Sequence, residues 1–242
     1  MVSEHIHIDL AEPITVERFD EAVLTGRGRA LALLQRILSR IAAVVGLAAL
    51  FTPLLLSAVV TLDLPLGFFD RIHGPSGMLP SAFLSRGEGT FVLATLGMLL
   101  ATRVVGAETS SRAVLVAWLM LGVCLLMIVA DLSPQLEPED FPDRRFIGFL
   151  LGSWLAGQYL ATWAYQLTRG GAWWRAPFFG AAVGFVVQAA IYFPGAYAGT
   201  GLPWRHWMAL DLIIGLTVAG VFVLFYGPLR LILRPQSGLG GR

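Results

Sequence analysis

Residues 41–62 read IAAVVGLAALFTPLLLSAVVTL and contain no charged side chain. About 20 consecutive apolar residues cross the hydrocarbon core of a bilayer, so this stretch predicts a transmembrane helix. Inside the bilayer every backbone amide and carbonyl group must find its partner within the protein, which makes a helix the expected form of the segment. The fold of the chain is therefore decided by how many stretches of this kind it contains.

Working outward from this stretch, we count five more. The predicted spans cover about 40–62, 89–106, 113–131, 146–167, 176–198 and 207–230. Of the 242 residues, 56% are hydrophobic and only 14% are charged, whereas a soluble domain carries about a quarter charged residues. The sequence thus predicts an all-α fold: a polytopic membrane helix bundle of about six transmembrane helices.

The residues before the first span predict an amphipathic helix at the cytoplasmic headgroups. Between Arg27 and Ile41, apolar side chains recur at helical spacing while arginines occupy other faces. We expect a cytoplasmic N-terminal segment over 1–39, the membrane domain over 40–231 and a flexible cytoplasmic tail over 232–242. The helix at the headgroups is interpreted as a lipid anchor, and a docking helix for a partner protein is the alternative.

The distribution of arginine predicts the orientation of the chain. All 17 basic residues are arginine, which together with abundant Ala, Leu and Gly indicates a GC-rich bacterial genome. Basic residues accumulate on the cytoplasmic side of membrane proteins. With the N-terminus inside, the cytoplasmic arginines are Arg18, Arg27, Arg29, Arg36, Arg40, Arg103, Arg112, Arg169, Arg175, Arg230, Arg234 and Arg242. The external ones are only Arg71, Arg86, Arg144, Arg145 and Arg205. We expect the bacterial cytoplasmic (inner) membrane, with both termini in the cytoplasm.

Polar and small residues mark the fourth and fifth spans as the centre of the bundle. Gln158 and Gln188 lie near the middle of these spans, where an amide needs a partner. That partner is either another helix or a substrate in a cavity, and both alternatives stay open. Small residues let helices approach closely, so we expect Gly152 and Gly184 to lie at helix contacts in the interior.

Residues 153–193, SWLAGQYLATWAYQLTRGGAWWRAPFFGAAVGFVVQAAIYF, resemble the fourth and fifth helices of the VUT family, which includes queuosine-precursor transporters. The upstream stretch from residue 89 resembles the second helix and the start of the third. The residues that match the family's layout are Ser153, Ala156, Gln158, Tyr165, Arg169, Trp174 and Arg175. The resemblance implies a six-helix unit similar to the substrate-binding components of vitamin importers.

The chain departs from the family's pattern at its acidic positions. Ala161 stands where the fourth helix of the family has Asp, and Gln188 stands where the fifth has Asp. The second helix is expected to lack its acidic residues as well, with an apolar run such as Leu96, Met98 and Leu99 in their region. The resemblance therefore implies a retained fold with an altered polar site.

The resemblance and the two amides together predict an uptake transporter of VUT type for a small neutral heterocyclic compound, queuosine-precursor-like. Gln158 and Gln188 would offer hydrogen-bonding edges to a purine-like ring, and Tyr159, Trp163 and Tyr192 would stack on it or line the pocket. The loop 63–88 would gate the outer mouth. The alternative is a non-transporting subunit or assembly factor of a larger membrane complex, which the missing acidic residues and the amphipathic segment favour.

Other functions have little support in the sequence. No span contains a Ser/His pair, a pair of Asp residues or an HExxH motif, so we expect no enzyme and no cofactor. His73 and Asp70 are too few ligands to predict a metal site. The arginines follow the topology rather than forming one patch, so nucleic acid is not an expected partner. The expected partners are the lipid bilayer and a small-molecule substrate, with a homo-oligomer or a membrane-complex partner left open.

Overall fold

The structure, a computed structural model, describes residues 26–67, 84–135, 143–233 and 235. Over these ranges the chain is helical, and the β-bridge between Pro65 and Ser85 belongs to no strand. The elements are α2 (Gly26–Val60), α3 (Arg86–Val105), α4 (Ala107–Leu132), the short 3-10 turn η3 (Ser133–Gln135), α5 (Arg144–Leu167), α6 (Arg175–Tyr197) and α7 (Trp204–Ile232). The prediction of an all-α helix bundle is confirmed.

Five of the described helices are long and apolar enough to cross a membrane, namely α2, α3, α4, α6 and α7. The chain is therefore a multi-pass membrane protein. The remaining long helix, α5, has 24 residues and is also long enough to cross, but it is more polar. It contacts α3, α4 and α6, and its polar residues Ser153 and Gln158 are buried. Helices surrounded in this way need less apolar surface than helices that face lipid.

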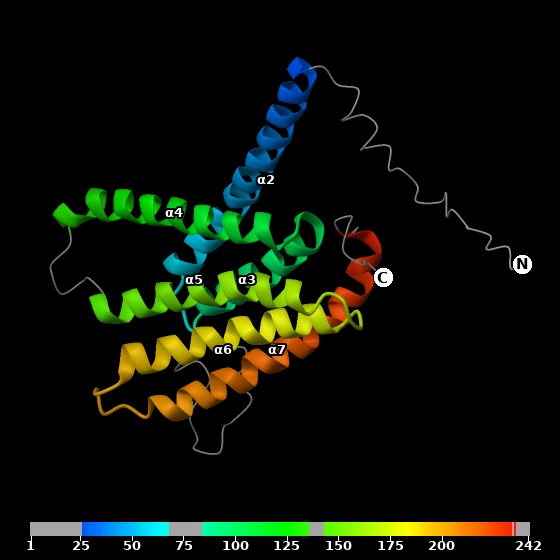
Figure 1. Ribbon diagram of the computed structural model, residues 1–242. Coiled ribbons are helices and arrows are strands. Elements are labelled where there is room, and N and C mark those ends of the chain that lie inside the picture. Colours follow the sequence, from blue (N-terminus) through cyan, green and yellow to red (C-terminus); the bar gives the residue numbers. More distant parts are fainter. Residues whose placement is uncertain (1–25, 68–83, 136–142, 234, 236–242) are drawn as a thin grey trace, which may run out of the picture. The chain divides into compact units, whose positions relative to one another are not determined.

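The helices α5 and α6 form the centre of the bundle. They share the most extensive helix–helix interface of the described chain, and α6 packs on α7 along its other side (Figure 1). A Cβ atom at Gly157 of α5 would lie 2.6 Å from the carbonyl oxygen of Gly184 on α6, so the two backbones touch. The prediction that these spans form the central pair, with Gly184 at a contact, is confirmed.

Gly152 is not part of this contact, and the prediction for it is wrong. It is exposed, and a Cβ atom there would have nothing within 4 Å. The glycine of α5 that contacts α6 is Gly157. Five residues along an α-helix correspond to a rotation of about 140° beyond one full turn, so a contact made through Gly157 turns Gly152 away from α6.

The chain divides into two compact units, residues 1–42 and 43–242. In the first unit the described residues, 26–42, are the beginning of α2 and expose Leu31, Leu34 and Leu38. The predicted helix that continues into the first span is confirmed, while its position at the headgroups stays a prediction. Of the predicted segment 1–39, residues 1–25 lie outside the described residues. Of the predicted tail 232–242, residues 234 and 236–242 lie outside them.

One residue separates α3 from α4. Gly106 has a φ of 83°, in the left-handed region that residues with a side chain rarely adopt. Its N–H donates to the carbonyl of Thr102 at 2.9 Å, and its own carbonyl accepts from the N–H of Ser110 at 3.0 Å. This glycine thus closes one helix and opens the next, where the predicted spans left a longer loop.

Candidate functional site

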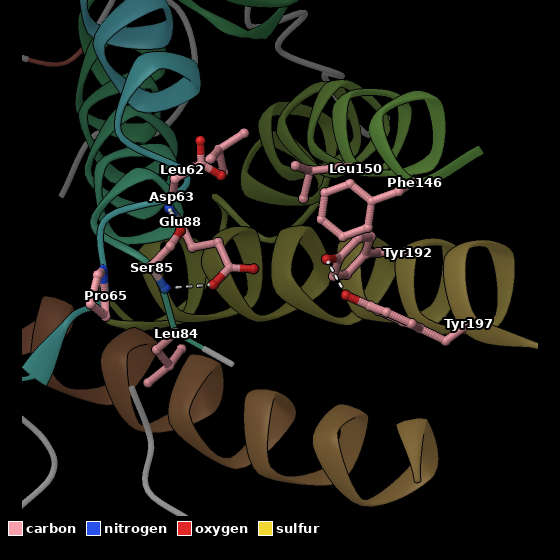
Figure 2. Close-up of a pocket in the computed structure, with 10 residues that line it drawn as sticks. All are labelled: Leu62, Asp63, Pro65, Leu84, Ser85, Glu88, Phe146, Leu150, Tyr192 and Tyr197. Carbon is pink, nitrogen blue, oxygen red and sulfur yellow. Dashed lines mark hydrogen bonds between the residues drawn. The ribbon is translucent and has the colours of Figure 1, made fainter. Parts of the chain in front are cut away.

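A cavity of about 270 Å³ lies at one end of the membrane helices. Its wall comes from the segment after α2, the start of α3, the start of α5 and the end of α6 (Figure 2). The lining residues are Leu62, Asp63, Pro65, Leu84, Ser85, Glu88, Phe146, Leu150, Tyr192 and Tyr197. Four parts of the sequence therefore converge on one space.

Backbone contacts hold the segment after α2 against the start of α3. The N–H of Arg86 donates to the carbonyl of Leu64 at 2.7 Å. At Gly87 a Cβ atom would collide with the carbonyl oxygen of Ala58, so only glycine allows this close approach. These contacts hold in position the wall of the cavity that carries Glu88.

Glu88 is positioned by a capping box at the start of α3. The N–H of Ser85 donates to Glu88 Oε2 at 3.0 Å, and the N–H of Glu88 donates to Ser85 Oγ at 3.0 Å. In Figure 2 the carboxylate extends into the cavity between Ser85 and the tyrosines. The predicted second span, 89–106, left Glu88 out, whereas α3 begins at Arg86 and so contains it.

Aromatic side chains form the wall opposite Glu88 (Figure 2). The hydroxyls of Tyr192 and Tyr197 are hydrogen-bonded at 3.1 Å. The ring of Phe146 meets both tyrosine rings edge-on, with centroids 5.9 and 6.1 Å away. Trp207 of α7 packs edge-on against Tyr197 at 5.4 Å. This wall therefore has little freedom to move and offers aromatic surface and hydroxyl groups.

An arginine near the cavity, Arg145, forms hydrogen bonds with backbone carbonyl groups. Arg145 Nε donates to the carbonyl of Gly195 at 2.7 Å, and its Nη2 donates to the carbonyl of Ala198 at 2.8 Å. The last carbonyls of a helix lack intrahelical partners, so this guanidinium caps α6 and ties it to the start of α5. These donors face the backbone carbonyls of α6 rather than the carboxylate of Glu88.

A second polar cluster lies at the other end of α3. Arg103 Nη1 donates to the hydroxyl of Tyr226 at 2.9 Å, and that hydroxyl is 2.7 Å from the hydroxyl of Tyr165. Arg103 also donates to the carbonyls of Leu233 and Arg230 at the end of α7, at 2.9 and 3.2 Å. One guanidinium thus joins α3, α5 and α7 at the end of the bundle away from the cavity.

Gln158, the first predicted site residue, is 2% exposed and bonded to another helix. Its Oε1 accepts from Trp118 Nε1 at 2.8 Å. Because an indole N–H can only donate, the amide oxygen must face Trp118 and the NH₂ group faces away. In the described chain this NH₂ group has no partner. Its neighbours include a stack in which Phe91 lies between Trp118 and Trp154.

The other predicted site residues occupy different environments. Gln188 is buried, with its Cβ 3.3 Å from where a Cβ would lie at Gly157. Tyr159 is half-buried against the core, and Trp163 is 40% exposed. Tyr192 is the one among the five that lines the cavity. That these residues bind one substrate stays a prediction.

The predicted gate, residues 63–88, contributes to the cavity at both of its ends. Asp63, Leu84, Ser85 and Glu88 line the cavity, whereas residues 68–83, which include Asp70 and His73, lie outside the described residues. The described part of the chain contains no group of three potential metal ligands. The sequence did contain a signal for Glu88, since Ser85–Arg86–Gly87–Glu88 has the S-x-x-E spacing of a capping box before an apolar run. No pattern in the sequence singled out Phe146 or Tyr197.

Comparison of the chain with protein-family models, with curated proteins and with solved structures gave no match.

Proposed function

We propose that the protein is a VUT-type uptake transporter of the bacterial cytoplasmic membrane, which receives a small molecule in the cavity between α3, α5 and α6. The cavity carries this proposal. Its volume of about 270 Å³ is close to the lower end of the range of about 300–1,000 Å³ typical of ligand pockets. Ionisable groups inside a membrane bundle are costly and mark functional sites, and Glu88 reaches into this space. The resemblance of residues 89–193 to the family adds support.

The arginine distribution supports a cavity on the outer side of the membrane. If the N-terminus is cytoplasmic, α2 runs outward, and every segment that lines the cavity lies at the external end of its helix. The cluster around Arg103 then lies at the cytoplasmic end. A reporter fused after Ile232 should read as cytoplasmic, and one fused after Pro134 should read as external. A cytoplasmic reading after Pro134 would reverse the proposed direction of uptake.

The transport proposal can be tested with the purified protein in proteoliposomes. We expect vesicles incubated with a bacterial metabolite extract to accumulate at least one small compound, identified by mass spectrometry. Leu150 lines the cavity and is 1% exposed, so Leu150→Trp should fill the cavity and reduce this accumulation to background. The matched control is Leu160→Trp on the same helix, where the side chain is 42% exposed and the larger ring meets lipid.

Melting temperatures of both variants show whether a loss of uptake reflects unfolding. If the folded wild-type protein accumulates no compound from any extract, the transport proposal fails. The non-transporting subunit would then be the better proposal, and the exposed leucines at the beginning of α2, among them Leu31 and Leu33, favour it.

A further inference from the structure

Glu88 brings a carboxyl group into the cavity, and in the described part of the chain no positively charged side chain bonds to it. One carboxylate oxygen accepts the backbone N–H of Ser85, and the other extends into the open space (Figure 2). In the described chain no arginine side chain bonds to Glu88, and the donors of Arg145 are used by carbonyls of α6. Glu88 is half-buried, and a carboxylate withdrawn from water without a partner is destabilising, so the site is suited to a ligand that supplies a positive charge.

The two charged side chains that line the cavity, Asp63 and Glu88, are both acidic. Asp63 lines the same cavity and is exposed. Clefts lined by charges of one sign concentrate ions of the opposite sign. The cavity should therefore attract cations and repel anions.

The aromatic wall fits an ammonium group in particular. Tyr192 and Tyr197 contribute electron-rich rings, and such rings attract cations through their faces. Phe146 and Leu150 provide apolar surface for the rest of a ligand. A metal ion would make no use of these two side chains, whereas an organic cation would contact both.

Building on the proposed function, we propose that the cavity selects a small organic cation, a protonated amine or quaternary ammonium on an apolar or ring-bearing body, with Glu88 as its counter-ion. This ligand differs from the neutral heterocycle predicted from Gln158 and Gln188. A neutral compound would leave the Glu88 carboxylate unbalanced, whereas a cation pairs with it and with the tyrosine rings.

Three probes of the same shape and different charge test the proposal with the wild-type protein alone. Benzylammonium, benzyl alcohol and benzoate share a ring and one substituent. By calorimetry in detergent, benzylammonium should bind about tenfold or more tightly than benzyl alcohol, because the ammonium forms an ion pair with Glu88 whereas the alcohol can donate only a hydrogen bond to it, and benzoate should not bind. Equal binding of the cation and the alcohol would overturn the proposal.

A matched pair of variants assigns the effect to Glu88. In Glu88→Gln the new amide oxygen can still accept the N–H of Ser85, so α3 keeps its capping box, and the affinity for benzylammonium should fall about tenfold or more. Glu108→Gln serves as the control, because Glu108 pairs with Arg112 on the exposed surface of α4 and should leave the affinity unchanged. Unchanged benzylammonium affinity in a folded Glu88→Gln protein would also overturn the proposal.

Two further results separate this inference from its rivals. Arg71 lies in the chain between α2 and α3, outside the described residues. If benzylammonium bound to an Arg71→Gln variant but not to the wild-type protein, Arg71 would be the partner of Glu88 in the wild-type protein, and the inference would fail. Uptake of a neutral compound that is insensitive to Glu88→Gln would keep the transport proposal and overturn the inference. Glu88-dependent binding of benzylammonium without uptake of any compound would support the inference and remove the transport proposal.

Discussion

Gly157→Leu should prevent α5 and α6 from packing and leave little folded protein. A Cβ atom at this position would lie 2.6 Å from the carbonyl oxygen of Gly184, which is backbone and cannot rotate away. Overpacking an interior costs about 1–3 kcal/mol when side chains can adjust, and here the helices themselves must separate. We expect a loss of at least about 3 kcal/mol, measured as a collapse of the monodisperse peak and of the melting temperature in detergent.

Gly152→Leu is the control for this substitution. Gly152 lies on the same helix, but it is exposed and a Cβ atom there would have nothing within 4 Å. The same leucine should therefore leave the peak and the melting temperature close to those of the wild-type protein. Equal damage by both substitutions would mean that α5 and α6 do not meet through Gly157.

Arg103→Ala should be the most damaging loss of a polar side chain. Arg103 donates to the hydroxyl of Tyr226 and to two carbonyls at the end of α7, and its guanidinium lies 5.5 Å from the centre of the Tyr226 ring. Hydrogen bonds to charged groups contribute about 1.5–3 kcal/mol each, so we expect a loss of about 2 kcal/mol or more in the free energy of unfolding. Arg103→Lys should restore only part of it, because an ammonium cannot reach three acceptors with the geometry of a guanidinium.

Arg112→Ala provides the comparison for Arg103→Ala. Both arginines belong to the predicted cytoplasmic side, so either substitution removes the same topological charge. Arg112 pairs with Glu108 across one helical turn at 2.7 Å, and both side chains are about 60% exposed. Such pairs contribute about 0.3–0.5 kcal/mol. A melting temperature lowered equally by both substitutions would mean that the cluster around Arg103 adds no stability.

The sequence predicted the helices well because length and apolarity determine them almost alone. All six predicted spans overlap long helices of the structure. The boundaries were less certain, and at α3 the boundary determined the interpretation of the site. Starting the second span at residue 89 placed Glu88 in a loop, whereas the helix begins at Arg86. A shift of three residues thus removed the one carboxylate of α3 from consideration.

The faces of the helices were harder to predict than their positions. Gly152 and Gly157 both belong to a run of small residues on α5, and the sequence alone did not show which of them meets α6. Trp163 was assigned to the site because it is aromatic and inside a span, yet 40% of it is exposed. The side of a helix that faces a neighbour is decided by packing with residues far away in the chain, and single-sequence patterns carry little information about that packing.

The glycine between α3 and α4 has a practical consequence for work on this protein. Helix α4 starts immediately after the positive-φ residue that ends α3, and the hydrogen bonds on both sides of Gly106 leave no slack in the backbone. Epitope tags and protease sites are tolerated in exposed, loosely held connections. The junction at Gly106 is short and hydrogen-bonded on both sides, so it should not tolerate them. A tag inserted at Gly106 would separate the two helices, whereas the connection between α6 and α7, with its two positive-φ glycines Gly199 and Gly201 and no side chain near either, offers a better position for antibody labelling.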